Sequence, residues 1–119
     1  MPEIQTVNSA VDMHMLLNKH KIVLIEFYSE WCYTCQTIIP VLNELAANNY
    51  RRIAVAKVDV EVLPELAIAY KIQHLPGLYF FKAGSIVNFV SGHQPLEVLQ
   101  EKVDLVSEIP RWNISPRGH

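Results

Sequence analysis

The strongest constraint on the fold is a short apolar run that leads directly into the chain's two cysteines. The run covers residues 22–28, with Glu26 as its one charged member, and a stretch with helical periodicity follows over residues 36–48. Cys32 and Cys35 lie at the junction between the two. The first turn of a helix brings residues at this spacing within bonding reach, and its unpaired N–H groups stabilise a thiolate. The arrangement therefore favours thiol–disulfide exchange.

Composition indicates one folded domain. The chain has 119 residues, of which half are apolar and 18% charged, so it can bury a core and does not resemble a disordered protein. Its formal net charge of −2 gives no electrostatic case for binding nucleic acid or an anionic membrane. The apolar runs are strand-sized, and the first residues lack a basic cluster ahead of an apolar core. We therefore expect a cytoplasmic protein.

The rest of the chain predicts alternating strands and helices. The expected strands cover residues 4–7, 22–28, 53–60, 78–82 and 86–90, and the expected helices cover residues 9–19, 36–48, 64–70 and 95–106. Helical crossovers imply parallel pairing in the first half, whereas the Ala83-Gly84 turn makes the last two strands an antiparallel hairpin. The expected fold class is α/β, with a mixed central sheet of about five strands flanked by helices on both faces.

The first predicted helix has a start signal and an apolar face. Ser9 is a good N-cap residue, and Asp12 three positions later completes a weak capping box. The apolar side chains predict a buried face formed by Val11, Met15 and Leu16.

The helix after the cysteines contains a proline inside its apolar stripe. The side chains expected to be buried are Ile38, Ile39, Leu42, Leu45 and Ala46. Pro40 removes one backbone hydrogen bond and crowds the preceding turn, so it should kink this helix.

We expect the domain to cover residues 1–107 and a loosely held C-terminal tail to cover residues 108–119. The tail contains two prolines, a glycine and Trp112. Docking of the tail on the domain through Trp112, and disorder of the tail, are both compatible with the sequence.

With these features, the chain closely resembles the thioredoxin family over about residues 4–106. The matching elements are Glu26-Phe27, Glu30-Trp31-Cys32, Cys35, Pro40, residues 55–59, Leu75-Pro76, residues 80–82, Gly84 and Gly92. A Cys-x-x-Cys pair alone is a moderate signal, but a preceding tryptophan, an acid in the preceding strand and a late proline make it strong. The resemblance implies the thioredoxin fold.

The resemblance also implies roles for the reactive residues. Cys32 corresponds to the nucleophile, partly exposed at the helix start, and Cys35 to the more buried resolving cysteine, which must ionise to displace the client. Glu26 matches the position where thioredoxins usually have a buried aspartate, and Lys57 matches the lysine beside it. Two interpretations of this pair stay open: proton transfer with Cys35, or a buried ion pair with a structural role only.

A substrate groove is implied as well. Pro76 matches the cis-proline that faces the cysteines, and Leu75 would offer backbone hydrogen bonds to an extended client chain. Trp31 and Gly92 would flank the same groove.

The residues between the cysteines depart from the family. Thioredoxins usually have Gly-Pro there, and this chain has Tyr33-Thr34. Because the loss of proline relieves rigidity and leaves an N–H free to stabilise sulfur, we expect a potential less reducing than the roughly −270 mV of thioredoxin. Tyr33 also adds an aromatic surface beside Cys32 for partner binding.

Two histidines are a further departure. His74 and His93 stand near the expected groove, where thioredoxins usually have small residues. An imidazole there could stabilise the Cys32 thiolate, or both could be ordinary solvated histidines. Together with Cys32 and Cys35 they also make four potential zinc ligands, so a Cys/His metal-binding module is an alternative function.

The function that the resemblance implies is a dithiol–disulfide oxidoreductase acting on protein disulfides. It needs no organic cofactor or metal, because the electrons reside on sulfur. The partners expected are protein disulfide substrates and a reductant such as a thioredoxin reductase-like donor, with the protein itself a monomer. A non-catalytic thioredoxin-like adaptor, which uses the groove only for binding, is the other alternative.

Overall fold

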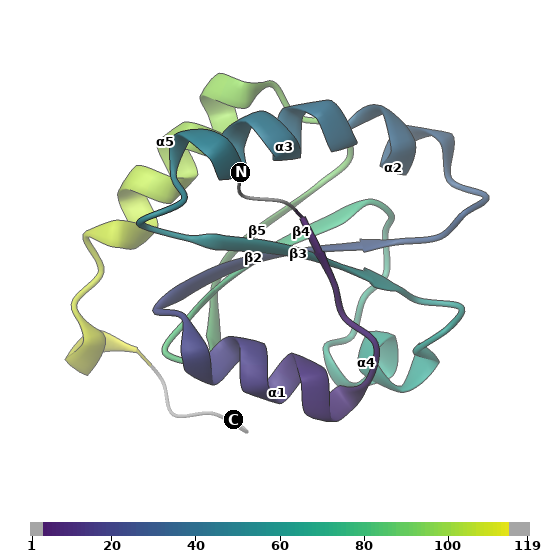
Figure 1. The fold of residues 1–119 in the computed structure, drawn as a ribbon, viewed down its shortest axis with the longest axis horizontal. Helices are drawn as coiled ribbons and strands as arrows, with labels where there is room; N and C mark the ends of the chain where they lie inside the picture. Colours follow the sequence, from purple (N-terminus) through teal and green to yellow (C-terminus); the bar gives the residue numbers. More distant parts are fainter. Residues whose placement is uncertain (1–3, 115–119) are drawn as a thin grey trace.

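A five-stranded sheet lies between two layers of helices in the computed structural model, which describes residues 4–114 (Figure 1). The strands are β1 (Gln5–Thr6), β2 (Ile22–Tyr28), β3 (Ala54–Asp59), β4 (Gly77–Lys82) and β5 (Ser85–Ser91). The helices are α1 (Ala10–Lys19), α2 (Tyr33–Thr37), α3 (Ile39–Asn48), α4 (Pro64–Ala69) and α5 (Leu96–Ser107), followed by the 3-10 helix η1 (Arg111–Asn113). Of the helices in residues 4–114, none is long and apolar enough to cross a bilayer.

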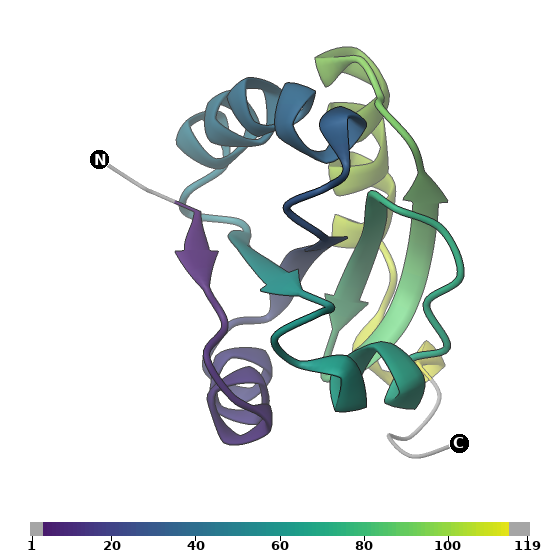
Figure 2. The ribbon, with the colours of Figure 1, turned by 90° about the vertical axis from the view of Figure 1, so that its right-hand side faces the viewer.

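The strand order is β1-β3-β2-β4-β5. β1, β3 and β2 pair in parallel, and β4 pairs antiparallel with both β2 and β5. Helices α2, α3 and α5 cover one face of the sheet, and α1 and α4 cover the other (Figures 1 and 2). The predicted mixed α/β sheet with helices on both faces is therefore confirmed.

Central strand β2 supplies both halves of the core, because successive side chains point to opposite faces. Val23, Ile25 and Phe27 pack in the cluster that includes α1 and α4 side chains. Ile22 and Leu24 pack in the cluster that includes α3 and α5 side chains. Glu26 continues this second alternation and is fully buried. Its carboxyl group is therefore directed toward the helical layer that begins with α2.

Helix α1 begins as predicted but buries a different face. The backbone N–H of Asp12 donates to Ser9 Oγ at 3.0 Å, which confirms the N-cap. Val11 and Met15 are, however, 68% and 64% exposed, so their predicted burial is wrong. The buried side chains are Met13, Leu16 and Leu17, so the predicted burial is confirmed for Leu16 alone. The helix carries two apolar stripes, and the stripe with both leucines offers more apolar area to the sheet.

The predicted kink at Pro40 is a complete break. α2 ends at Thr37 and α3 begins at Ile39, so Pro40 lies in the first turn of α3, where a missing N–H breaks no helical hydrogen bond. The predicted apolar stripe is confirmed for Ile38, Leu42, Leu45 and Ala46, and Ile39 is half-buried. α2 is thus a separate five-residue helix that carries Cys35.

The first part of the predicted tail is fixed to the sheet. Lys82 Nζ donates to the carbonyl oxygens of Val106 at 2.8 Å and Ser107 at 3.1 Å, and also to the carbonyl of Ile109. Trp112 is 85% exposed, so the tail does not dock through this side chain. Residues 115–119 of the predicted tail lie outside the described residues.

Candidate functional site

Cys32 and Cys35 form a disulfide at the start of α2, with their Cα atoms 5.2 Å apart. Cys32 is the N-cap residue, in extended backbone conformation, and its Sγ accepts a hydrogen bond from the Cys35 backbone N–H at 3.2 Å. The N-cap position places a side chain against N–H groups that the helix leaves unpaired. The predicted strand-to-helix junction therefore delivers the Cys32 sulfur to electropositive backbone groups.

The two sulfurs differ in access to solvent. Cys32 is half-buried, whereas Cys35 is 1% exposed. An incoming thiol or disulfide can therefore reach Cys32 and not Cys35. Trp31 and Tyr33 lie beside Cys32 in the sequence and are 85% and 81% exposed. The residues on either side of Cys32 in the chain therefore present aromatic surface that the fold leaves uncovered.

The Leu75-Pro76 peptide bond is cis, as predicted. Gly77 pairs with Phe27 of β2 and with Ser91 of β5, so Pro76 lies at the end of the sheet from which β2 continues toward Cys32. Pro76 itself is buried, and Leu75 is half-buried. This register brings the loop before Gly77 and the loop after β2 to the same end of the sheet.

Gly92 joins that edge through a backbone hydrogen bond. Its N–H donates to the Pro76 carbonyl at 2.9 Å, and its φ of +83° lies in the left-handed region that favours glycine. A Cβ built on Gly92 would meet no heavy atom within 4 Å. The glycine is therefore required by its backbone conformation, and the space above it is open.

His93 contacts α2, and His74 does not share in this contact. The His93 Nδ1 lies 3.1 Å from Thr37 Oγ1, whose hydroxyl also donates to the Thr34 carbonyl at 2.9 Å. Because the hydroxyl proton is directed to that carbonyl, the imidazole Nδ1–H is the donor to Thr37. Thr37 was not predicted as a site residue, since no local pattern indicates a contact across 56 positions. His74 is exposed.

Glu26 is a buried acid without a hydrogen-bond partner on either carboxylate oxygen. Burial raises its pKa from 4.5 to about 7, and the charge of Lys57 opposes that rise in part. The two residues are paired in register across β2 and β3, yet they form no ion pair, so of the two interpretations left open by the sequence the structure does not contain the buried ion pair. The half-buried Lys57 instead places its Nζ 5.4 Å from the centre of the Tyr28 ring. This leaves a carboxyl group poised between its two protonation states near neutral pH.

The alternative of a metal-binding module has no site in the described chain. Within residues 4–114, no group of three or more His, Cys, Asp and Glu side chains is arranged to hold a metal ion. The four candidate ligands, Cys32, Cys35, His74 and His93, are therefore not brought together as a tetrahedral set.

Comparison with known proteins assigns the family. The thioredoxin family model matches residues 4–105. Thioredoxin Y2, chloroplastic, from Arabidopsis thaliana is 40% identical over 100 residues, which cover 84% of this chain and 59% of that protein. A thioredoxin from Staphylococcus aureus is 41% identical over 81 residues, which cover 68% of this chain and 78% of that protein. The match to a second chloroplastic Arabidopsis thioredoxin covers 57% of that protein, so the chain spans less than two thirds of both plant relatives.

Solved structures agree with the sequence comparison. A mutant thioredoxin from Halobacterium salinarum superposes with a TM-score of 0.84 at 31% identity, covering 91% of this chain and 94% of that one. A thioredoxin from Malassezia sympodialis superposes with a TM-score of 0.82 at 27% identity, covering 90% and 93%. The disulfide at the start of α2, the matching family model and these two superpositions show that the chain belongs to the thioredoxin family.

Proposed function

We propose that this protein is a thiol–disulfide oxidoreductase that exchanges its Cys32–Cys35 pair with disulfides of protein clients. The observation that carries the proposal is the difference in access between the two sulfurs, half-buried at Cys32 and 1% exposed at Cys35. Exchange requires one sulfur that a client can reach and a second that reacts only after the first is occupied.

The reduced protein would act in two steps. The Cys32 thiolate attacks one sulfur of the client disulfide, which forms a mixed disulfide and releases the first client thiolate. The Cys35 thiol then loses its proton and attacks the Cys32 sulfur, so that the Cys32–Cys35 disulfide forms and the second client thiolate leaves. Two electrons pass from the cysteine pair to the client, and a reductase-like donor returns them.

Glu26 is the proton acceptor that we assign to the second step. A buried thiol ionises reluctantly, and a base with a pKa near the working pH accepts its proton most effectively. The pKa of Glu26, about 7, meets this requirement, and its side chain is directed toward the layer that carries α2. Lys57 would tune this group through its charge without contacting it.

The groove for the client would be formed by Trp31, Tyr33, Leu75, Pro76, Gly92 and His93. The exposed aromatic pair offers apolar contact beside the accessible sulfur, and the half-buried Leu75 offers backbone groups to an extended chain. The contact between His93 and Thr37 supports a role for this histidine in positioning α2.

We further propose a reduction potential less reducing than that of thioredoxin, because Tyr33-Thr34 replaces the Gly-Pro pair. Equilibration with glutathione buffers, read by mass spectrometry after thiol alkylation, measures it. A potential at or below roughly −270 mV would contradict this part of the proposal and leave the exchange activity untouched.

Reduction of insulin by dithiothreitol tests the activity itself. The parent protein should accelerate the appearance of turbidity from the released insulin chain, and Cys32→Ser should return the rate to that of dithiothreitol alone. An adaptor that only binds clients would leave the rate unchanged in both forms, and that result would overturn the proposal.

A further inference from the structure

The end of the sheet opposite the disulfide contains an open cleft of about 600 Å³. It is bounded by the end of α1, the start of β2, the turn before β3, the turn after β4 and the residues after α5. Figure 1 shows these segments together at the left of the molecule and α2 at the right. Since β2 runs seven residues between the two ends, they are on the order of 20 Å apart.

Basic side chains dominate the lining of this cleft. They are Lys19, His20, Lys21, Arg51, Arg52, Lys82 and Arg111. The lining thus holds six of the ten Lys and Arg residues of the chain, and no Asp or Glu of residues 4–114 is part of it. The net charge of −2 hides this segregation, because the acidic residues are distributed elsewhere.

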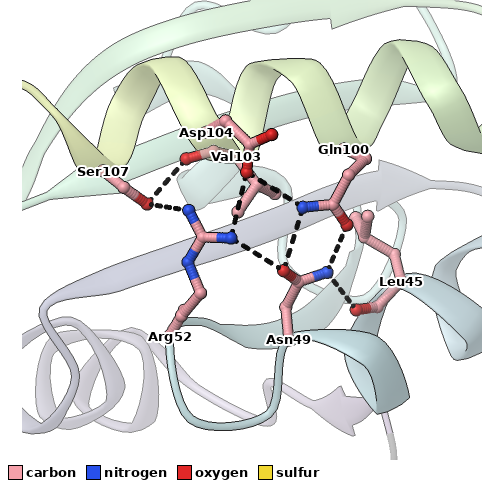
Figure 3. A network of polar contacts seen from close by, with 7 residues as sticks. All are labelled: Leu45, Asn49, Arg52, Gln100, Val103, Asp104 and Ser107. Carbon is pink, nitrogen blue, oxygen red and sulfur yellow. Dashed lines mark hydrogen bonds and ion pairs between the residues drawn. The ribbon is translucent and has the colours of Figure 1, made fainter.

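Strand pairing and hydrogen bonds hold the segments that line the cleft in fixed positions relative to one another. Ile22 pairs with Lys82 across β2 and β4, and the Ala83 N–H donates to the Lys21 carbonyl at 3.2 Å. Arg52 binds Asp104 at 3.0 Å and Ser107 at 2.9 Å, which fastens the end of α5 to the turn before β3 (Figure 3). The cleft is therefore a preformed part of the fold.

Three cations of the cleft have no partner among residues 4–114. Lys19, Lys21 and Arg111 are exposed, and their side chains make no hydrogen bond or ion pair within that part of the chain. Burial and then the charge of Lys21 lower the pKa of Lys82, so these two cations repel each other. Burial and then the charge of Lys19 lower the pKa of His20 in the same way. A bound anion would relieve this repulsion.

We propose that this cleft binds a small polyanion that carries two or more phosphate groups. Lysine ammonium groups bind phosphate as point charges, and the planar guanidinium of arginine binds it with two N–H groups. A volume of about 600 Å³ suits a small molecule. Single-stranded nucleic acid is disfavoured, because no Phe, Tyr or Trp of residues 4–114 lines the cleft to stack on bases. The site is independent of the proposed exchange activity.

Calorimetric titration of the full chain with sodium tripolyphosphate, in about 0.15 M salt, tests the proposal, since exposed charges farther apart than about 8 Å are then largely screened. Tripolyphosphate should bind saturably at one site and more tightly than orthophosphate. Arg111→Gln and the double variant Lys19→Gln/Lys21→Gln should each weaken binding about tenfold or more, because charge-assisted contacts are lost. These side chains are exposed and form no hydrogen bond or ion pair within residues 4–114, so we expect the variants to fold.

Lys71→Gln is the matched control, because Lys71 is an exposed lysine outside the cleft and its loss changes the net charge by the same amount as Arg111→Gln. It should leave the affinity unchanged. Pyrophosphate and ADP form two further arms: equal affinities identify the phosphate chain as the recognised group, and tighter ADP adds a nucleoside contact. Absence of saturable tripolyphosphate binding, an equal loss in Lys71→Gln, or saturation only by a long oligonucleotide would overturn the proposal.

Discussion

The two ends of the sheet solve different problems with different parts of the chain. The disulfide end depends on one nearly continuous stretch, residues 26–37, together with two short segments at 75–77 and 91–93. The basic cleft draws its lining from four separate segments of the chain. At the first end Glu26 of β2 is fully buried, whereas at the second most cations are exposed.

That difference follows from the range of the forces involved. Forming a disulfide requires Cα atoms at a restricted separation, here 5.2 Å, which a single helical turn supplies. Attraction of an anion acts over several ångströms and tolerates small shifts of each cation. The residues required for disulfide exchange therefore lie mainly in one short motif, whereas the residues required to bind an anion come from several parts of the fold.

The largest effect that we expect lies at the disulfide end. Cys35→Ser leaves the accessible Cys32 able to attack a client but removes the group that releases it. The variant should therefore accumulate a stable mixed disulfide with insulin and lose turnover down to the rate of dithiothreitol alone. Non-reducing electrophoresis and mass spectrometry of the adduct measure this. The control, Cys32→Ser, should form no comparable adduct, and an adduct of equal yield in the control would show that the assignment of nucleophile is wrong.

The next effect concerns the buried acid, through the dependence of stability on pH. The pKa of Glu26 is about 7 in the folded protein and 4.5 in its ordinary state, so folding favours the protonated form. Its contribution is fully present below pH 4.5 and is lost as the pH rises through 7. Between pH 4.5 and 8.5 this loss should amount to roughly 3 kcal/mol of unfolding free energy.

Urea unfolding of the oxidised protein at pH 5 and pH 8.5 measures that loss. Glu26→Gln carries no titrating group at this position, so the difference between the two pH values should be smaller in the variant by about the same amount. Equal pH dependence in parent and variant would show that the buried carboxyl does not titrate in this range. A buried titrating acid would then no longer distinguish the disulfide end from the basic cleft.

Local signals in the sequence predicted the disulfide end well. The N-cap at Ser9 and the apolar run of β2 each follow from a few neighbouring residues, and the structure confirms both. Pro40 likewise indicated a disturbance of the helix, which the structure shows as a break where a kink was predicted. The Cys32–Cys35 pair follows from the spacing of cysteines at a strand-to-helix junction. Local structure of this kind is determined by consecutive residues, so it can be inferred without the tertiary structure.

Other features depended on choices that the sequence leaves open. Val11 and Met15 form an apolar stripe as regular as the one that is buried, and only packing on the sheet distinguishes the two. Register did pair Glu26 with Lys57, but the lysine side chain turns toward the Tyr28 ring. The basic cleft was missed because net charge carries no information about where charges meet in space.

A smaller effect is expected at the Asn49 network, which joins the end of α3 to α5 (Figure 3). Asn49 is 4% exposed, and its amide donates to the Leu45 carbonyl at 2.8 Å and to Gln100 at 2.7 Å. Asn49→Ala should lower the unfolding free energy by about 2 kcal/mol, because buried hydrogen-bonding groups lose their partner. Urea unfolding measures this, with the exposed Asn43→Ala as control. A loss in the control as large as in Asn49→Ala would contradict a special role for the network.

The smallest expected effect is an increase in the free energy of unfolding. It tests whether repulsion between the cations of the cleft destabilises the folded protein. The Lys21 side chain is exposed, forms no hydrogen bond or ion pair with residues 4–114, and repels Lys82. Lys21→Gln should therefore raise the unfolding free energy by about 0.3 kcal/mol at low salt, within the usual range for surface substitutions. The gain should fade as salt shortens the range of the repulsion. Unfolding at low and at about 0.5 M salt measures both values. Lys71→Gln, at a position outside the cleft, should show no comparable gain.

A lysine that lowers the stability of the free protein but is needed to bind an anion is what a binding site requires. If Lys21→Gln is instead less stable at every salt concentration, Lys21 contributes to the stability of the fold.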